Sequence, residues 1–128
     1  MPIIENKVKK AMELFLCSNG YLSVKARMGT RKGYDVEGIN PKNKKLLVIE
    51  CKGEAQRGNQ RHRSWPNVAS AILTSLNETH NPKNTNEVGI ALPDTELYRE
   101  RIKYLKAFFE REGISVFLVS ENGSVQEW

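Results

Sequence analysis

Residues 35–52 read DVEGINPKNKKLLVIECK, two apolar segments around one polar turn. The Asn and Pro residues at 40–44 are typical of a hairpin connection between two antiparallel strands. If residues 41–44 form a four-residue turn, the register pairs Val36 with Ile49 across the hairpin. A shift of one residue would turn every side chain to the opposite face, so this register is a testable expectation.

The same register places the carboxylates of Asp35 and Glu50 side by side. Directly opposed residues have Cβ atoms ~4.5–5.5 Å apart, and two such carboxylates repel each other unless a cation lies between them. Because side chains alternate along a strand, Lys52 shares the face of Glu50 and Cys51 points away. Converging oxygen ligands favour Mg²⁺ or Mn²⁺, which would acidify a bound water and stabilise charge on a phosphate. Lys52 would orient or deprotonate that water and contact the phosphate.

The flanking segments predict one α/β domain over residues 1–128, with helices packed on a mixed central sheet. Apolar residues recur with helical spacing in several segments, and other apolar runs have the length of buried strands. The expected elements, in chain order, are a helix over 4–18, strands over 21–28, 34–39 and 45–52, an exposed loop over 54–64, a helix that opens at Trp65-Pro66 and runs to Glu78, a strand over 87–92, a long helix capped by Asp94 or Thr95 that ends near Gly113, a strand over 114–119 and an edge strand over 124–128.

Positive charge is concentrated in the middle of the chain. The net charge is +5, and residues 25–63 contain eleven Lys and Arg against four acids, a net +7 that leaves −2 elsewhere. A basic region around an acidic centre is typical of a polyanion-binding site, although a solvated basic face has the same composition. No apolar stretch approaches the ~18–20 residues of a membrane helix. Cys17 and Cys51 lie in unlike contexts and indicate reduced thiols in a cytoplasmic protein.

The acidic hairpin carries a family resemblance. Asp35, followed fifteen residues later by Glu50 in Glu-Cys-Lys, resembles the motif of the PD-(D/E)xK, or restriction-endonuclease-like, nucleases. The expected order αβββαβ is similar to the core of that superfamily, and a further helix and strands follow it. The archaeal Holliday-junction resolvases have an opening similar to Leu14 through Arg27. The resemblance implies that Asp35 and Glu50 bind Mg²⁺ together with the backbone carbonyl of Cys51, and that Lys52 is catalytic.

The resemblance covers roughly residues 4–92 and departs from the family at three positions. The proline of the first motif is absent. The family often has a glutamate on the first helix, where the aligned residue is Lys9. Glu5, one turn earlier at the edge of the apolar stripe, is the candidate to complete the site, and Glu13 is the alternative. Ala71 occupies the place of a glutamine on the second helix.

Several residues near the motif have two interpretations. Glu37 shares the face of the acidic pair and either holds a second metal or faces solvent. Glu54 and Gln56 either belong to the site or are loop residues. Trp65 either anchors a helix in the core or stacks on a base, and His62 either assists proton transfer or is an exposed polar residue.

Together these features predict a Mg²⁺-dependent endodeoxyribonuclease that hydrolyses phosphodiester bonds in duplex or branched DNA by a metal-activated water. One active site per chain makes a symmetric homodimer a hypothesis for cutting two strands. Two alternatives remain, a non-catalytic nuclease-fold module that binds nucleic acid in a larger complex, and a structural protein with an incidental acidic pair. Nothing in the sequence separates DNA from RNA. The residues expected to contact nucleic acid are Lys25, Arg27, Arg31, Lys32, Arg57, Arg61 and Arg63.

Overall fold

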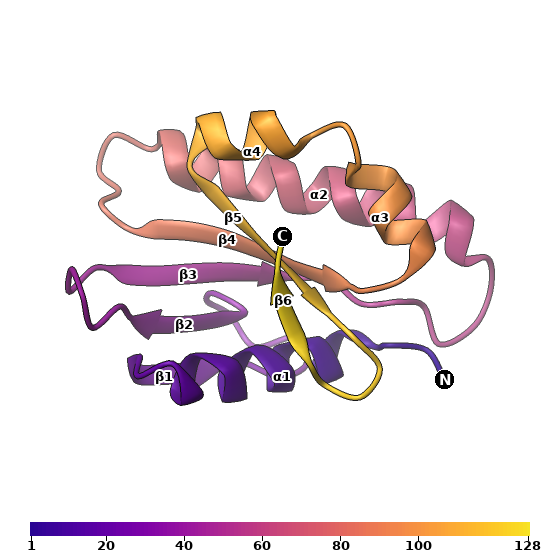
Figure 1. Cartoon of the computed structure of the whole chain (residues 1–128), viewed down its shortest axis with the longest axis horizontal. Helices are drawn as coiled ribbons and strands as arrows, with labels where there is room; N and C mark the ends of the chain where they lie inside the picture. Colours follow the sequence, from indigo (N-terminus) through magenta and orange to yellow (C-terminus); the bar gives the residue numbers. More distant parts are fainter.

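The computed structural model describes all 128 residues and contains one six-stranded sheet and four helices (Figure 1). The strands lie in the sheet in chain order, from β1 to β6, with both parallel and antiparallel neighbours. The expected α/β class with a mixed sheet is confirmed. The elements are α1 (Glu5–Ser18), β1 (Leu22–Ala26), β2 (Val36–Ile39), β3 (Leu46–Cys51), α2 (Gln60–His80), β4 (Glu87–Pro93), α3 (Glu96–Ile102), α4 (Lys106–Glu112), β5 (Ile114–Val119) and β6 (Val125–Glu127).

Strands β2 and β3 form the expected hairpin with the expected register. Val36 lies opposite Ile49 in an antiparallel ladder. The backbone N–H of Asn40 donates to the carbonyl of Lys45 over 2.8 Å and closes the turn. The ladder begins at Val36, so Asp35 lies one residue before the strand rather than inside it.

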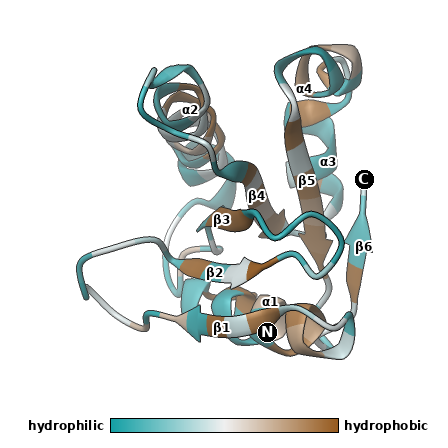
Figure 2. Ribbon diagram, turned by 90° about the vertical axis from the view of Figure 1, so that its left-hand side faces the viewer, coloured by the Kyte–Doolittle hydropathy of each residue, from teal (hydrophilic) through white to brown (hydrophobic).

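The sheet separates two layers of helices, with α1 on one face and α2, α3 and α4 on the other (Figure 2). Alternate residues of one strand reach opposite cores. In β5, Phe117 belongs to the cluster around α1, while Val116 and Leu118 belong to the cluster around α2 to α4. Strands buried on both faces are apolar at successive positions, which explains the runs at 46–49 in β3, 88–92 in β4 and 116–119 in β5.

Three parts of the chain converge at one edge of the sheet. Strands β3, β4 and β5 are parallel, so their carboxyl ends lie at the same edge. Strand β2 runs antiparallel to β3 and therefore begins at this edge. The first residues of α1 also lie here, because Gly53, just after β3, packs against the backbone of Glu5. In open α/β sheets this edge is where ligands usually bind.

Helix α2 begins five residues earlier than the sequence predicts, because Asn59 caps it. The side chain of Asn59 accepts a hydrogen bond from the backbone N–H of His62, as an N-cap residue does. Pro66 consequently lies inside the helix, not at its start. The expectation of an exposed loop over 54–64 is therefore wrong for residues 60–64.

The single long helix expected after Thr95 is also wrong, since the chain forms two short helices there. The hydroxyl of Thr95 caps α3, as predicted, by accepting from the backbone N–H of Tyr98 over 3.2 Å. The chain then turns after Ile102, and α4 continues to Gly113. Helix α3 packs against α2 whereas α4 packs against β5, and one straight helix would not make both contacts.

The two edge strands differ in how well the sequence predicts them. The strand expected over 124–128 is present as the short β6, antiparallel to β5. Strand β1 is shorter than expected, and it is irregular: Ser23 has a φ of 52°, and the pairing with β2 shifts between Leu22 and Lys25. None of the four helices is long and apolar enough to cross a membrane.

Candidate active site

Asp35 is held at the edge of the sheet by the backbone of the neighbouring strand. Its Oδ2 atom accepts a hydrogen bond of 2.8 Å from the backbone N–H of Cys51. Its own carbonyl accepts from the backbone N–H of Arg27 over 2.8 Å, so β1 also fixes this residue. The carboxylate is mostly buried, with 21% of the side chain exposed. Its position therefore follows from the sheet rather than from a mobile loop.

Glu50 and Lys52 extend from the same face of β3, as the alternation of a strand requires. The Nζ atom of Lys52 lies 3.4 Å from Oε2 of Glu50. Burial, and then the negative charge of Asp35, raise the pKa of Glu50, and the nearby Lys52 only partly opposes them. The predicted proximity of Asp35 and Glu50 thus has an electrostatic consequence in the folded protein.

Cys51 lies between Glu50 and Lys52 in the chain, but its side chain points into the core around α1. Burial raises the pKa of its thiol well above the ordinary value, so this side chain stays a neutral core group. Only the backbone of Cys51 takes part in the site, and its N–H donates a hydrogen bond to Asp35.

Gly53 allows the chain that leaves β3 to pass directly against α1. A Cβ atom at this position would lie 2.1 Å from the backbone nitrogen of Glu5, so only glycine fits. On the other side, the amide of Asn67 on α2 donates to the carbonyl of Gly53 over 3.1 Å. The segment after Lys52 is therefore clamped between two helices. The sequence interpretation missed both Gly53 and Asn67, which lack any chemical motif.

Lys9 is the most informative residue that the sequence interpretation left without a role. It is 1% exposed and is the only charged residue among those fully buried. Its Nζ atom lies 3.2 Å from Oε2 of Glu5 and 3.6 Å from Oδ1 of Asp35. The sequence contains a signal for this burial, because Glu5, Lys9 and Met12 are spaced to share one face of α1.

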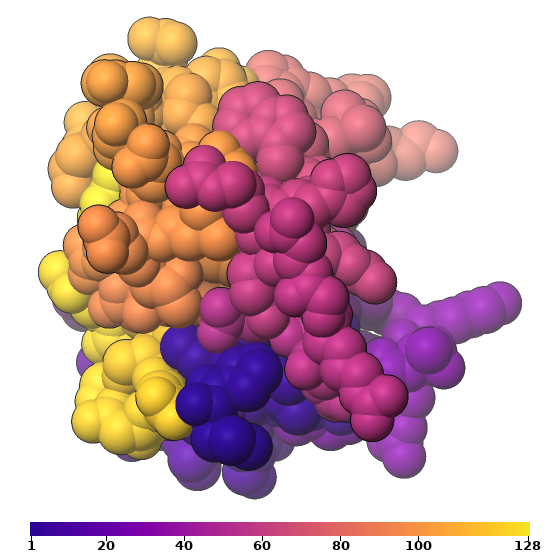
Figure 3. Space-filling view, turned by 90° about the vertical axis from the view of Figure 1, so that its right-hand side faces the viewer, coloured from indigo at the N-terminus to yellow at the C-terminus, as the bar shows by residue number.

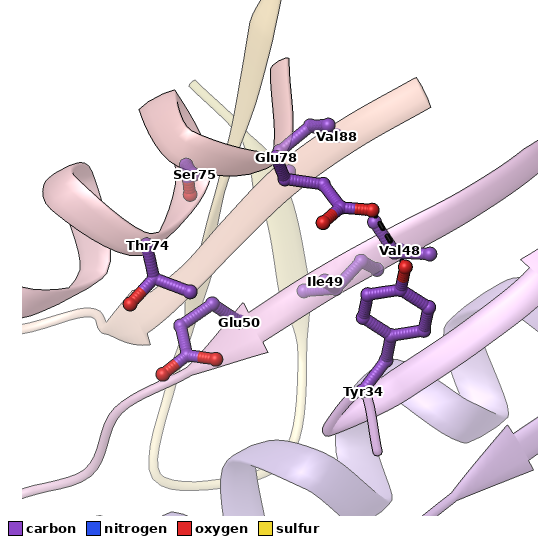
Figure 4. Close-up of a pocket in the computed structure, with 9 residues that line it drawn as sticks. Tyr34, Val48, Ile49, Glu50, Thr74, Ser75, Glu78 and Val88 are labelled. Atoms are coloured by element: carbon purple, nitrogen blue, oxygen red, sulfur yellow. Dashed lines mark hydrogen bonds between the residues drawn. The ribbon is translucent and has the colours of Figure 1, made fainter. Parts of the chain in front are cut away.

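A small pocket adjoins Glu50 on the α2 side of the sheet. Figure 4 shows Glu50 beneath Thr74, with Tyr34 and Glu78 joined at the other end of the pocket. The hydroxyl of Tyr34 donates to Oε1 of Glu78 over 2.6 Å, and this bond is the main reason why the pKa of Tyr34 is raised. The bond ties the segment before Asp35 to α2.

The other acidic candidates are engaged in contacts that the sequence did not predict. Glu37 forms a salt bridge with Arg27, so it neither meets the acidic pair nor simply faces solvent. Glu54 accepts a hydrogen bond from the backbone N–H of Ile3 over 2.9 Å and fixes the start of the chain. Glu13 is paired with Lys10 on the surface of α1, 2.9 Å away.

Most of the basic residues expected to contact nucleic acid are exposed. Arg27 is the exception, because its guanidinium also donates to the carbonyl of Tyr34 and so holds the loop before β2. Figure 3 shows the end of the molecule where β3 and β4 finish, and the start of α2, in magenta, crosses it beside the indigo N-terminal residues. The exposed members are Lys25, Arg31, Lys32, Arg57, Arg61 and Arg63.

Trp65 is 62% exposed, so the expectation of a core anchor is wrong. The guanidinium of Arg101 lies 5.2 Å from the centre of its ring, within the range of a cation–π contact. Arg101 is itself held by the hydroxyl of Ser64 and by the carbonyl of Arg61, at 3.0 and 3.1 Å. The indole therefore stands on a fixed support at the surface. His62 is exposed as well.

The donor set at this edge fits a hard divalent cation such as Mg²⁺. The residues that would hold it are Asp35 and Glu50, with the backbone carbonyl of Cys51. No three His, Cys, Asp or Glu side chains lie close enough together to form a metal cage. Mg²⁺ does not require one, because it usually keeps several waters and takes one or two carboxylates from the protein. The raised pKa of Glu50 marks negative charge that a cation would stabilise.

No protein-family model and no curated protein sequence matches this chain. A functional assignment therefore depends on the residues and geometry of the site.

Proposed function

We propose that this protein is a metal-dependent nuclease of the PD-(D/E)xK type that hydrolyses phosphodiester bonds in DNA. The observation that carries the proposal is the meeting of Asp35, Glu50 and Lys52 at one edge of the sheet, with Lys52 3.4 Å from Glu50. A carboxylate pair with a neighbouring lysine is costly for stability. The arrangement is explained if the pair binds a cation and the lysine binds a phosphate.

The protein groups have separate tasks in this proposal. Asp35 and Glu50 supply the negative oxygens, and the hydrogen bond from Cys51 holds Asp35 in its orientation. Lys52 orients or deprotonates the attacking water and contacts the non-bridging oxygens of the scissile phosphate. A divalent cation at these carboxylates would supply the Lewis acidity that the side chains lack.

Nucleic acid is the substrate class that the charge of this face favours. Lys52 lies beside Glu50, and the exposed arginines Arg57, Arg61 and Arg63 follow β3 in the chain, up to the start of α2 at the same end of the molecule (Figure 3). A phosphate backbone bound by such residues releases counterions, and its affinity falls steeply with salt. DNA is proposed rather than RNA only because the superfamily that the motif resembles usually cleaves DNA.

Cleavage of defined substrates tests the proposal. Plasmid, linear single-stranded and branched DNA would each be incubated with Mg²⁺, Mn²⁺ or EDTA, with wild type, Asp35→Ala and Lys52→Ala side by side. We expect metal-dependent cutting that Lys52→Ala lowers by about 10²–10⁴-fold, because general acid–base or charge catalysis is lost. Lys42→Ala, an exposed lysine of the hairpin turn, is the matched control and should cut like wild type.

The second candidate is a nuclease-fold module that binds nucleic acid without cutting it. The observation that favours it is the buried ammonium of Lys9 beside Asp35, which supplies positive charge without any metal. In that case no substrate is cut under any metal condition, while salt-sensitive binding persists in wild type and Lys52→Ala alike. Cutting that depends on Lys52 excludes this candidate.

Cellular location and assembly belong to the same proposal. The two cysteines are free thiols, Cys17 exposed and Cys51 buried, which is the usual state in a cytoplasmic protein. A homodimer would bring two active sites to the two strands of a duplex or junction. The mass of the free protein and of its DNA complex in solution would test the homodimer.

A further inference from the structure

Lys9 occupies a cage of oxygen atoms between α1 and the loop before β2. Its Nζ donates to the backbone carbonyls of Arg27 and Gly29, at 2.8 and 3.3 Å. The carboxylates of Glu5 and Asp35 lie 3.2 and 3.6 Å away. A lysine that is 1% exposed is costly to bury unless its charge is compensated, and these four oxygens compensate it.

This cage has the composition of a cation site. Two carboxylates and two backbone carbonyls are oxygen ligands of the kind that hard cations take. The loop that provides the carbonyls is fixed a second time, because the backbone N–H of Gly29 donates to the side chain of Asn6 over 3.1 Å. The oxygens are therefore held in place around the ammonium by α1 itself.

Asp35 stands between this cage and the other acidic side chain of the site. One of its oxygens is near Lys9, which reaches it from α1. Glu50 and Lys52 approach from the opposite side of the sheet, the side that the α2 pocket occupies. Positive charge is thus already present on the α1 side. Three carboxylates, of Glu5, Asp35 and Glu50, face the two ammonium groups of Lys9 and Lys52, so one negative charge is left uncompensated.

We propose that Lys9 is a resident cation of the active site and limits it to one divalent ion per chain, bound between Asp35 and Glu50. The inference rests on the proposed metal-dependent function and names the ion count of that site. In this arrangement the carboxylate of Glu5 pairs with Lys9, so Glu5 is a positioning residue and not a metal ligand. The ammonium occupies the place of a second divalent ion with half its charge, and it cannot activate a water.

Titration of the full-length protein with Mn²⁺ alone, without nucleic acid, tests the inference. Isothermal calorimetry, together with the electron paramagnetic resonance signal of free Mn²⁺, would count the ions bound per chain. Wild type should bind one. Lys9→Ala, which opens the cage, should bind two. Lys10→Ala removes an exposed lysine from the next position and should still bind one.

A second pair of variants separates the roles of the two acids. Asp35→Asn should weaken Mn²⁺ binding by about 10–100-fold or more, whereas Glu5→Gln should change it by no more than about threefold. Lys9→Gln is the reserve variant if Lys9→Ala does not fold, which circular dichroism and a melting curve would show. It removes the charge and leaves part of the cage filled, so a second, weaker Mn²⁺ is expected.

The outcomes distinguish this inference from the proposed function. Two Mn²⁺ ions in wild type would overturn the role of Lys9 and leave the nuclease proposal intact. One ion in wild type and still one in the folded Lys9 variants would overturn it as well. No Mn²⁺ in wild type would contradict both the nuclease proposal and the inferred single-ion site.

Discussion

The carboxylate of Asp35 and the backbone N–H of Cys51 are joined by a hydrogen bond of 2.8 Å. The bond connects the residue before β2 to the last residue of β3, across the open end of the hairpin. Because the donor is a backbone group of a central strand, it is as rigid as the sheet. The orientation of Asp35 is therefore set before any ligand binds, which is what a preorganised site requires.

Asp35→Asn and Asp35→Ala should separate this structural contact from the chemical role. The asparagine can still accept from Cys51, so this variant should melt at a higher temperature than the alanine variant, while cleavage falls by at least about 100-fold. The alanine leaves the N–H of Cys51 without its acceptor and should also lower the free energy of unfolding by about 1–3 kcal/mol. Melting curves and initial cleavage rates of both variants check this. Equal melting temperatures for the two would show that the bond contributes nothing.

The raised pKa of Glu50 makes a prediction about stability and pH. The folded protein holds the Glu50 proton more tightly than the unfolded chain does, so stability falls as the pH rises from the unfolded pKa through the folded one. Glu50→Gln removes this dependence. In EDTA, the variant should melt at a higher temperature than wild type at pH 7, and the difference should shrink as the pH is lowered towards about 4.5.

Mn²⁺ provides the control for the Glu50 prediction. An ion that binds only the folded protein stabilises it, so the melting temperature of the wild type should rise when Mn²⁺ is added at pH 7. Glu50→Gln has lost a ligand, so its melting temperature should rise much less. A variant that is less stable than wild type at every pH would show that the Lys52 contact outweighs burial and the charge of Asp35.

Local patterns in the sequence predicted the centre of the fold. The apolar runs and the polar turn give β2 and β3 with the correct register, because a shifted register would turn Val36 away from the core around α1. The same alternation placed Glu50 and Lys52 together. These features depend only on residues that are neighbours in the chain or directly opposed across one hairpin.

Features that depend on distant contacts were not predictable in this way. The burial of Lys9 requires a loop twenty residues later to supply carbonyl oxygens. The division of α3 from α4 follows from packing on two different neighbours, although the apolar spacing continues across the break. Proline favours the first turn of a helix, so the sequence predicts a start at Trp65-Pro66, whereas the structure starts the helix at the cap of Asn59.

We predict that Ser75→Ala, a substitution beside the site, stabilises the protein. Ser75 is 1% exposed, lines the pocket next to Glu50, and has no hydrogen-bond partner for its Oγ atom. Ser75→Ala removes an unsatisfied polar group and adds a better helix former, so the free energy of unfolding should rise by about 1 kcal/mol. Ser64 is the matched control on the same helix, because its hydroxyl is bonded to Arg101.

Ser64→Ala should lower the free energy of unfolding by about 1–2 kcal/mol, since it leaves part of the Arg101 guanidinium without a partner. Urea unfolding of both variants beside wild type measures the two effects. A loss of stability in Ser75→Ala similar to that in Ser64→Ala would contradict the prediction, because it would mean that the Ser75 hydroxyl is bonded.

From the exposed Trp65 we predict that the protein binds nucleic acid with unpaired bases in preference to a duplex. Its exposed ring is supported by Arg101, and Arg61 and Arg63 lie on the same helix end to hold phosphates. An aromatic side chain stacks on a base with about 1–3 kcal/mol, so Trp65→Ala should weaken binding to a single-stranded oligonucleotide by roughly 5–150-fold. Binding to a blunt duplex, whose bases are stacked on one another, should change much less.

Tyr104 offers a matched control for Trp65. It is 86% exposed, and the ammonium of Lys103 lies 5.0 Å from the centre of its ring, so it has the same chemistry on a different helix end. Fluorescence anisotropy of labelled oligonucleotides at two salt concentrations would compare Trp65→Ala and Tyr104→Ala with wild type. Trp65→Ala should lower affinity while the slope against salt stays the same, because no phosphate contact is lost. Equal losses in both variants, or a loss for the duplex as large as for the single strand, would assign Trp65 a different role.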